Sequence, residues 1–129
     1  DGQYNGLVES YYEDGTLKSK ENYTDGKKNG LLESYYEDGT LMFKENYTDG
    51  KKNGLYESFR VDGTLWSMEN YKDGKRDGQR IFWFGDGSKL IENYSDGKLD
   101  GLKGYIEIDG RNWGNSCYKN DEEVPMSNC

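Results

Sequence analysis

The feature that most constrains this chain is an internal repeat. Glycines at positions 6, 30, 54 and 78 each open a copy of 24 residues, except that the fourth copy is one residue shorter and ends before the glycine at position 101. A single copy cannot bury a hydrophobic core, so the copies must stack on one another. We therefore predict one domain over residues 1–129, with repeats at 6–29, 30–53, 54–77 and 78–100 and a degenerate cap at 101–129.

Each copy contains two runs that are typical of strands. In the first copy they are residues 7–12 and 16–23, and Asp14-Gly15 lies between them as a strong hairpin signal. Asp25-Gly26 and Asn29-Gly30 then bracket a longer turn into the next copy. No apolar period of 3.6 residues persists anywhere. The sequence predicts an all-β fold, an elongated antiparallel β-meander of about five stacked β-hairpins of 23–24 residues.

The register of the hairpin follows from its turn. A three-residue loop with Gly15 in the left-handed position pairs Tyr11 with Leu17. Strand alternation then predicts one face for the positions that stay the same between copies. In the first copy these positions are Leu7, Glu9, Tyr11, Leu17, Glu21 and Tyr23. The other face would hold the variable positions, namely Val8, Leu32 and Tyr56, then Tyr12, Tyr36 and Arg60, then Lys18, Met42 and Trp66.

Two sets of aromatic residues are distinguished by these faces. Tyr23, Tyr47, Tyr71 and Tyr94 recur in register and are interpreted as structural. The variable face of a single-layer sheet stays partly exposed, and contiguous exposed aromatic surface marks interfaces. We predict partner binding there, strongest in the third and fourth copies, by Tyr12, Tyr36, Tyr56, Trp66, Met68, Phe82 and Phe84.

Composition argues against several classes of function. A net charge of -8 disfavours nucleic acid and anionic membranes as partners. With no histidine, a serine or cysteine nucleophile lacks its usual base, and a zinc site lacks ligands. Glu9, Glu33 and Glu57 recur in register, whereas an active site is normally singular, so we interpret them as a structural ladder. We expect no enzymatic activity, no metal and no cofactor.

Cys117 and Cys129 leave two alternatives open. They are either unrelated thiols or a disulfide that staples the C-terminal tail. A disulfide would indicate a secreted, cell-surface or periplasmic protein, and reduced thiols a cytoplasmic one. At the other end, residues 1–6 match residues 25–30, so the chain begins inside a repeat and we expect further residues upstream.

The repeat resembles a known family. The pattern Gly-Leu-x-x-x-Tyr-Tyr-x-Asp-Gly-x-Leu, followed by Glu-Asn-Tyr-x-Asp-Gly-Lys-x-x-Gly, is similar to the MORN-variant repeat (membrane occupation and recognition nexus). Bacterial proteins of the YwqK-like antitoxin family are built from this repeat. The resemblance covers roughly residues 1–110, implies an elongated sheet of stacked hairpins and supplies no catalytic residues.

Two functions follow as expectations. The first is a non-catalytic protein–protein interaction module, with an antitoxin or immunity role as one version, in which the acidic surface steers a basic partner. The alternative is a secreted or cell-surface glycan-binding repeat protein, whose aromatic side chains stack on sugars.

Overall fold

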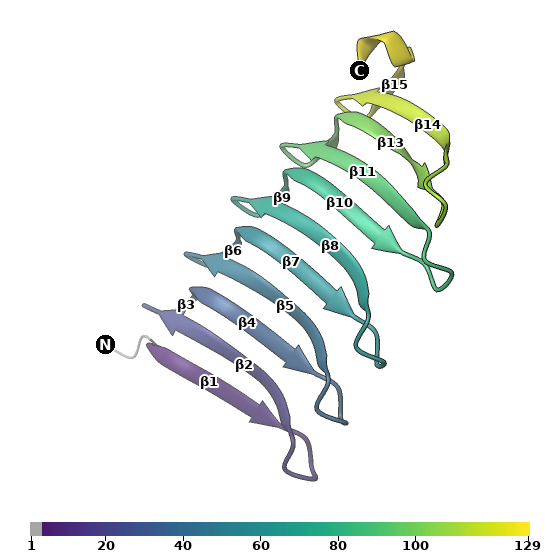
Figure 1. Ribbon diagram of the computed structural model, residues 1–129. Coiled ribbons are helices and arrows are strands. Elements are labelled where there is room, and N and C mark those ends of the chain that lie inside the picture. The colour runs from purple at the N-terminus through teal and green to yellow at the C-terminus, as the bar shows by residue number, and fades with distance from the viewer. Residues whose placement is uncertain (1–3) are drawn as a thin grey trace.

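The computed structural model describes residues 4–129, which form one open antiparallel sheet of 15 strands (Figure 1). The first strand of each copy is β1 (Gly6–Tyr11), β4 (Gly30–Tyr35), β7 (Gly54–Phe59), β10 (Gly78–Trp83) or β13 (Gly101–Ile106). The long second strand is β2 (Leu17–Thr24), β5 (Leu41–Thr48), β8 (Leu65–Lys72), β11 (Lys89–Ser95) or β14 (Asn112–Lys119). The predicted all-β meander of hairpins is confirmed, while the start of the partial repeat recognised at residues 1–6 lies outside the described residues.

The hairpin turn has the predicted three-residue loop. The Tyr12 N–H donates to the Thr16 carbonyl at 2.8 Å, and the Gly15 N–H donates to the Tyr12 carbonyl at 2.9 Å. Gly15 adopts φ 91°, where a side chain would be strained. Asp14 accepts hydrogen bonds from the Thr16 hydroxyl and N–H, which hold the pKa of its carboxyl below the ordinary value. The Asp-Gly pair therefore fixes the register, and Tyr11 pairs with Leu17.

One residue further along, the predicted faces fail. Ser10 pairs with Ser19, so Lys18 is an extra residue on β2, a β-bulge. The bulge reverses the alternation that follows it: Glu21 pairs with Val8, and Tyr23 pairs with Gly6. The assignment of Glu21 and Tyr23 to the face of Leu7 is therefore wrong, as it is for their equivalents Glu45, Tyr47, Glu69 and Tyr71.

The short fourth copy shows which residue it has lost. β10 and β11 pair without any register shift, from Gly78 opposite Tyr94 to Trp83 opposite Lys89. The missing position is the bulge that is present in the first three copies. The hairpin of β13 and β14 also has a register shift, but it lies further along β14, because Trp113 is paired with Tyr105. Deletion of the extra residue removes a bend but leaves the pairing of the remaining residues intact.

The longer turn predicted between copies is instead a second tight hairpin. Asp25 (φ 50°) and Gly26 (φ 78°) form a two-residue loop in which both residues have positive φ, and Thr24 pairs with Lys27 across it. This hairpin adds a short third strand to each copy, which the sequence analysis missed. These strands are β3 (Lys27–Lys28), β6 (Lys51–Lys52), β9 (Lys75–Arg76), β12 (Lys98–Leu99) and β15 (Glu122–Val124), and the 3-10 helix η1 (Met126–Asn128) follows the last.

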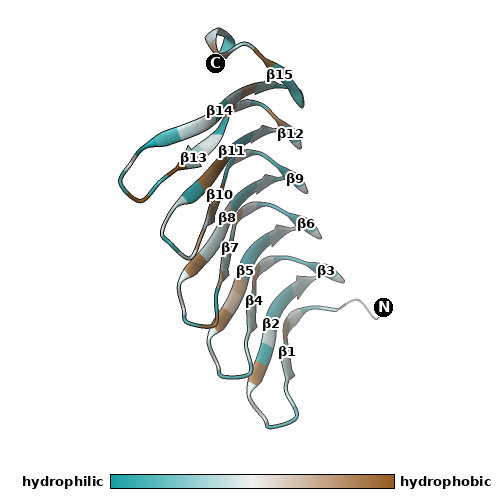
Figure 2. Ribbon diagram, turned by 90° about the vertical axis from the view of Figure 1, so that its right-hand side faces the viewer, coloured by the Kyte–Doolittle hydropathy of each residue, from teal (hydrophilic) through white to brown (hydrophobic). Residues whose placement is uncertain are grey.

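Few backbone pairs join one copy to the next. Between β5 and β7 only Phe43–Ser58 and Lys44–Glu57 are paired. Side chains add further links, because the Asn46 amide donates to the Leu55 carbonyl at 3.0 Å. The turn contributes as well, since the Gly50 N–H donates to the Lys28 carbonyl at 2.8 Å. The stack is thus held by short, repeated contacts between neighbours, and its long strands bend along their length (Figure 2).

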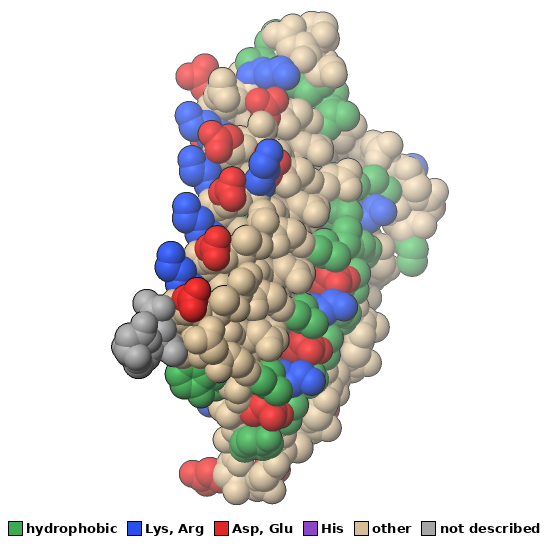
Figure 3. Space-filling model, turned by 90° about the vertical axis from the view of Figure 1, so that its left-hand side faces the viewer, with side chains coloured by type: hydrophobic (Ala, Val, Ile, Leu, Met, Phe, Trp, Pro, Cys, Tyr) green, Lys and Arg blue, Asp and Glu red, His purple; other side chains and the backbone are tan. Residues whose placement is uncertain are grey.

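The sheet has two different faces. We call one the ladder face: Glu9, Lys20, Glu33, Lys44 and Glu57 lie opposite one another across its strands. The Lys44 ammonium lies 3.4 Å from the Glu57 carboxylate, and the Tyr35 hydroxyl donates to Glu33 at 3.0 Å. Figure 3 shows acidic and basic side chains alternating along the stack. The recurring glutamates therefore make structural contacts, as the sequence predicted for them.

The opposite face we call the aromatic face, because Tyr12, Tyr36, Tyr56, Trp66, Phe82 and Phe84 lie on it together with the displaced Glu21 and Tyr23 and their equivalents. The described residues include no helix that is both long enough and apolar enough to cross a membrane.

Candidate functional site

A groove on the aromatic face arises from one row of side chains that crosses the whole sheet. Neighbours in this row face each other on adjacent strands. In order, the row reads Ser10, Ser19, Ser34, Phe43, Ser58, Ser67, Phe82, Leu90, Tyr105 and Trp113. Two small residues, Ser58 and Ser67, therefore lie between two phenylalanines. The sequence of the row itself produces a hollow there.

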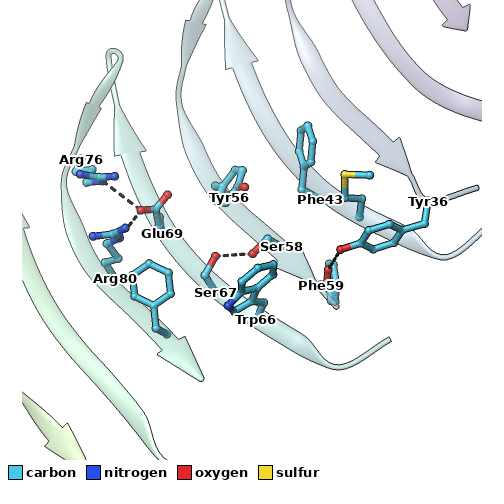
Figure 4. A pocket seen from close by; sticks show the side chains of 12 residues that line it. Tyr36, Phe43, Tyr56, Ser58, Phe59, Trp66, Ser67, Glu69, Arg76 and Arg80 are labelled. Carbon is cyan, nitrogen blue, oxygen red and sulfur yellow. Dashed lines mark hydrogen bonds and ion pairs between the residues drawn. The ribbon is translucent and has the colours of Figure 1, made fainter. Parts of the chain in front are cut away.

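The hollow is a groove of about 390 Å³ in the third copy (Figure 4). Its floor is formed by Ser58 and Ser67, whose hydroxyls lie 2.5 Å apart. Large side chains surround this serine floor: Tyr36, Met42, Phe43, Phe59, Tyr56, Trp66 and Phe82, with Glu69, Arg76 and Arg80 as charged members. The Phe43 and Tyr56 rings stack with centroids 6.0 Å apart. The groove thus combines apolar walls, a small polar floor and one charged end.

The structure brings together some of the predicted binding residues and separates others. Tyr36, Tyr56, Trp66 and Phe82 line the groove. Phe84 lies on the same face, near the hairpin end of the fourth copy, and Tyr12 lies on that face in the first copy. Met68 lies on the ladder face, because it pairs with Glu57 and Ile81. Grouping Met68 with the aromatic face was wrong, and the unrecognised bulge at Trp66 is the reason.

Tyr12 and Tyr36 also hold neighbouring copies together. The Tyr12 hydroxyl donates to the Tyr35 carbonyl at 2.5 Å, and the Tyr36 hydroxyl donates to the Phe59 carbonyl at 2.7 Å. In the third copy the same position is Arg60, whose guanidinium donates to the Trp83 carbonyl. The position looks variable in sequence, yet in three copies it supplies a donor to the next copy. Tyr12 and Tyr36 therefore have a structural contribution that the sequence did not indicate.

The charged end of the groove is centred on Glu69, whose side chain is only 9% exposed. Arg76 Nε lies 3.2 Å and Arg80 Nε lies 2.5 Å from the same Glu69 oxygen. Arg80 also reaches Glu92 at 3.0 Å, and its guanidinium lies 4.3 Å from the centroid of the Phe82 ring. A carboxylate this poorly hydrated is stable only because cations surround it.

Neutral tyrosines border the same region. Burial raises the pKa of Tyr56, and the carboxylates of Glu45 and Glu69 raise it further. Burial likewise raises the pKa of Tyr47 to about 12, and Glu45, which accepts a hydrogen bond from the Tyr47 hydroxyl at 3.0 Å, raises it too. Both phenols remain neutral at physiological pH, and Tyr56 therefore presents an apolar ring and a hydroxyl group to anything that enters the groove.

A second aromatic cluster was missed by the sequence analysis. The Phe84 and Tyr105 rings stack at 5.8 Å, and Tyr105 and Trp113 stack at 4.8 Å with planes 8° apart. Trp113 is 53% exposed. Its position in the cap is equivalent to Trp66, but the degenerate sequence of the cap concealed the correspondence. Counting back 47 residues from Tyr118 to Tyr71 would have revealed it.

The C-terminal tail is fastened to β14. Cys117 and Cys129 form a disulfide, with their Cα atoms 5.9 Å apart, and Cys117 is fully buried. Of the two alternatives that the sequence left open, the structure contains the disulfide. Over residues 4–129, no three histidine, cysteine, aspartate or glutamate side chains are grouped so that they could hold a metal ion.

These features define a repeat protein with a single open sheet, one face of which carries an aromatic groove. In comparisons with known proteins, the MORN repeat variant matches residues 4–25 and 28–49, two adjacent repeats at the N-terminal end. MORN repeats generally serve as protein- or membrane-binding modules. A search of curated proteins finds no match.

Proposed function

We propose that the chain is a non-catalytic protein–protein interaction module that binds its partner through the aromatic face. The observation that carries this proposal is the groove above the serine floor, where Tyr56, Trp66 and Phe82 converge. Trp66 is 50% exposed. Tryptophan and tyrosine in a concave, partly desolvated site are the side chains that contribute most to protein interfaces. An enzyme is disfavoured because the repeated carboxylates are paired with cations and the chain has no histidine.

An antitoxin or immunity role is the specific version that we favour. Its support is the resemblance of the repeat to those of the YwqK-like antitoxin proteins. The disulfide supports a secreted, cell-surface or periplasmic location, because such bonds persist in oxidising compartments. A rigid repeat array also suits this role, since a preformed surface loses little conformational entropy on binding.

The test is a pull-down from native lysate and culture supernatant with three forms of the protein. Wild type is compared with a Trp66→Ala, Phe84→Ala double variant and with Tyr11→Ala. Tyr11 lies on the ladder face and is 56% exposed, so its variant removes an aromatic ring of similar exposure from the other side. A protein retained by wild type and Tyr11→Ala but lost by the folded double variant supports the proposal. Identical eluates from all three forms contradict it.

Glycan binding is the second candidate, and the exposed stack of Phe84, Tyr105 and Trp113 favours it. Trp113 is the outer ring of this stack and belongs to β14. The next strand, β15, pairs with Cys117–Lys119 of β14 and not with Trp113. Sugars pack on aromatic faces, and Glu107 and Asp86 line the same depression with carboxylates that can accept hydrogen bonds from sugar hydroxyls. A glycan array tests this candidate: signal from wild type that disappears in Trp113→Ala supports it, whereas a pure protein binder gives none.

A further inference from the structure

The charge of the aromatic face differs from that of the whole molecule. Its carboxylates can be matched one by one with cations. Lys28 lies 3.5 Å from Glu21, and Lys52 lies 3.2 Å from Glu45. Lys103 of the cap lies 3.2 Å from Glu92 of the fourth copy. Each of these glutamates is neutralised by a cation of its own.

Glu69 has two partners, Arg76 and Arg80, and Arg80 shares Glu92 with Lys103. Among the cations that contact these glutamates, Arg80 is the one left over when each carboxylate is matched with one cation. Earlier copies hold Val8, Leu32 and Tyr56 at its position. The extra positive charge therefore enters the array at the groove, on a chain whose net charge is -8.

The chemistry of an occupant follows from this arrangement. A basic segment would be attracted by the outer turns but repelled by Arg80 and Arg76 at the end of the groove. An arginine pairs best with a carboxylate, which it can grip through two parallel hydrogen bonds. The apolar walls require a large side chain, and 390 Å³ is near the small end of the range for ligand pockets, roughly 300–1,000 Å³, so one or two side chains fill it.

We propose that the groove binds an acidic peptide segment of the partner. An aromatic or large aliphatic side chain fills the hollow above the serine floor. An aspartate or glutamate one or two residues away pairs with Arg80 and Arg76. This inference rests on the proposed function and specifies the partner. The excess positive charge at the groove selects the partner, and the acidic surface of the rest of the chain does not.

The array itself supplies the variants for a test. Ser67→Phe fills the groove with the residue that the second copy carries in the same place, Phe43. Arg80→Leu removes the extra cation and introduces leucine, the residue that the second copy carries at the equivalent position, Leu32. The ion pair between Glu69 and Arg76 stays intact in this variant. Because the repeat already accommodates both side chains, circular dichroism should show a folded sheet. If Ser67→Phe does not fold, Trp66→Ala replaces it as the groove variant.

The experiment selects a phage-displayed library of random peptides on the full chain, with the groove variant as the counter-selection. Wild type should enrich peptides that carry an aromatic or large aliphatic residue within two positions of an aspartate or glutamate. A synthetic peptide of the consensus should bind Arg80→Leu at least tenfold more weakly than wild type. Replacement of the acidic residues of the peptide by lysine should abolish its binding.

Each other outcome is decisive. Groove-dependent peptides rich in lysine or arginine, or an affinity unchanged in Arg80→Leu, would overturn the acidic segment while the proposed function stands. Failure of wild type to enrich any peptide over the groove variant would overturn the groove as a protein-binding site, and the proposed function with it.

Discussion

The first two copies and the third and fourth are built on the same hairpin plan but differ in the side chains that they present. Copies one and two differ at three positions, where Val8, Lys18 and Ser19 in the first are replaced by Leu32, Met42 and Phe43 in the second. All three positions lie on the aromatic face, because the bulge turns two consecutive side chains toward it. The turns and the ladder face are unchanged between these copies. The ladder face and turns are therefore the scaffold, and the aromatic face is where the copies vary.

Further along the array the scaffold itself begins to change. The alternation of glutamate and lysine on the ladder face ends at Glu57, and Met68, Ile81 and Ile91 continue the row. Of these, Ile81 is buried. The C-terminal half thus gains apolar packing on one face and an aromatic groove on the other. The MORN repeat variant matches the N-terminal copies, where the scaffold is most regular. The serine floor of the groove and most of its lining residues lie beyond the matched residues.

The first effect expected from this comparison concerns two equivalent glutamates. The Glu69 side chain is 9% exposed and touches two guanidiniums, while that of Glu21 is 21% exposed and has one lysine at 3.5 Å. Removing one member of a buried ion cluster costs about 3 kcal/mol, and an exposed pair contributes less than about 1 kcal/mol. Urea unfolding should therefore separate Glu69→Gln from Glu21→Gln by about 2 kcal/mol. Equal losses of unfolding free energy in the two variants would mean that the N-terminal and C-terminal halves of the array depend equally on these ion pairs.

The second effect distinguishes the two ends of the stack. Replacing Cys129 by serine opens a disulfide whose cysteines are 12 residues apart, and loops of this length contribute about 3 kcal/mol. Because the contacts in a repeat array are between neighbours, the loss should remain in the cap. Hydrogen exchange should accelerate in β13, β14 and β15 and remain unchanged in β1–β5. Uniform acceleration along the whole sheet would show that the array unfolds as one unit.

Much of the fold was predictable from the sequence because the determinants are local. Asp14-Gly15 sets the loop and the pairing of Tyr11 with Leu17, and the period of the glycines sets the stacking. The bulge at Lys18 was not predictable from one copy, since nothing in its residue type marks it. The sequence did contain a signal, because the fourth copy forms the same hairpin with one residue fewer. An element that tolerates the loss of a residue contains an irregular position.

The groove itself was harder to predict from the sequence than the residues that line it. Tyr56 and Phe82 were assigned to the aromatic face correctly because their strands, β7 and β10, carry no bulge. Trp66 was assigned correctly because it is one of the two bulge residues that face that side. The hollow between Phe43 and Phe82 depends on pairs that join different copies, and a sequence read copy by copy does not contain that register. Arg80 was missed for the same reason: its partner Glu69 lies on the preceding copy.

A smaller effect tests the bulge. Deleting Lys18 should convert the first copy to the pairing of the fourth, with Ser10 still opposite Ser19 and Glu9 still opposite Lys20. Lys18 is exposed and its main contact is with the Tyr12 ring at 5.7 Å, so we expect a loss of less than about 1 kcal/mol. The measurement is the thermal unfolding of this variant. The control is a variant that lacks Ser19 instead, in which Lys18 would lie opposite Ser10. A large loss from deleting Lys18 would show that the first copy requires the bend that the fourth lacks.

The smallest effect at neutral pH concerns Tyr47 in the second copy. Its pKa of about 12 exceeds the ordinary value of 10, so the native state holds the phenol proton more tightly than the unfolded chain does. The stabilisation is therefore complete below pH 10 and is lost as pH rises toward 12. Urea midpoints measured from pH 8 to pH 12 should fall less steeply for Tyr47→Phe than for wild type. Tyr71, one copy further, also has a raised pKa, but Lys52 and Arg76 oppose the shift, so Tyr71→Phe should flatten the curve less. Parallel curves for wild type and Tyr47→Phe would contradict the coupling of this phenol to Glu45 and assign the alkaline loss to other tyrosines.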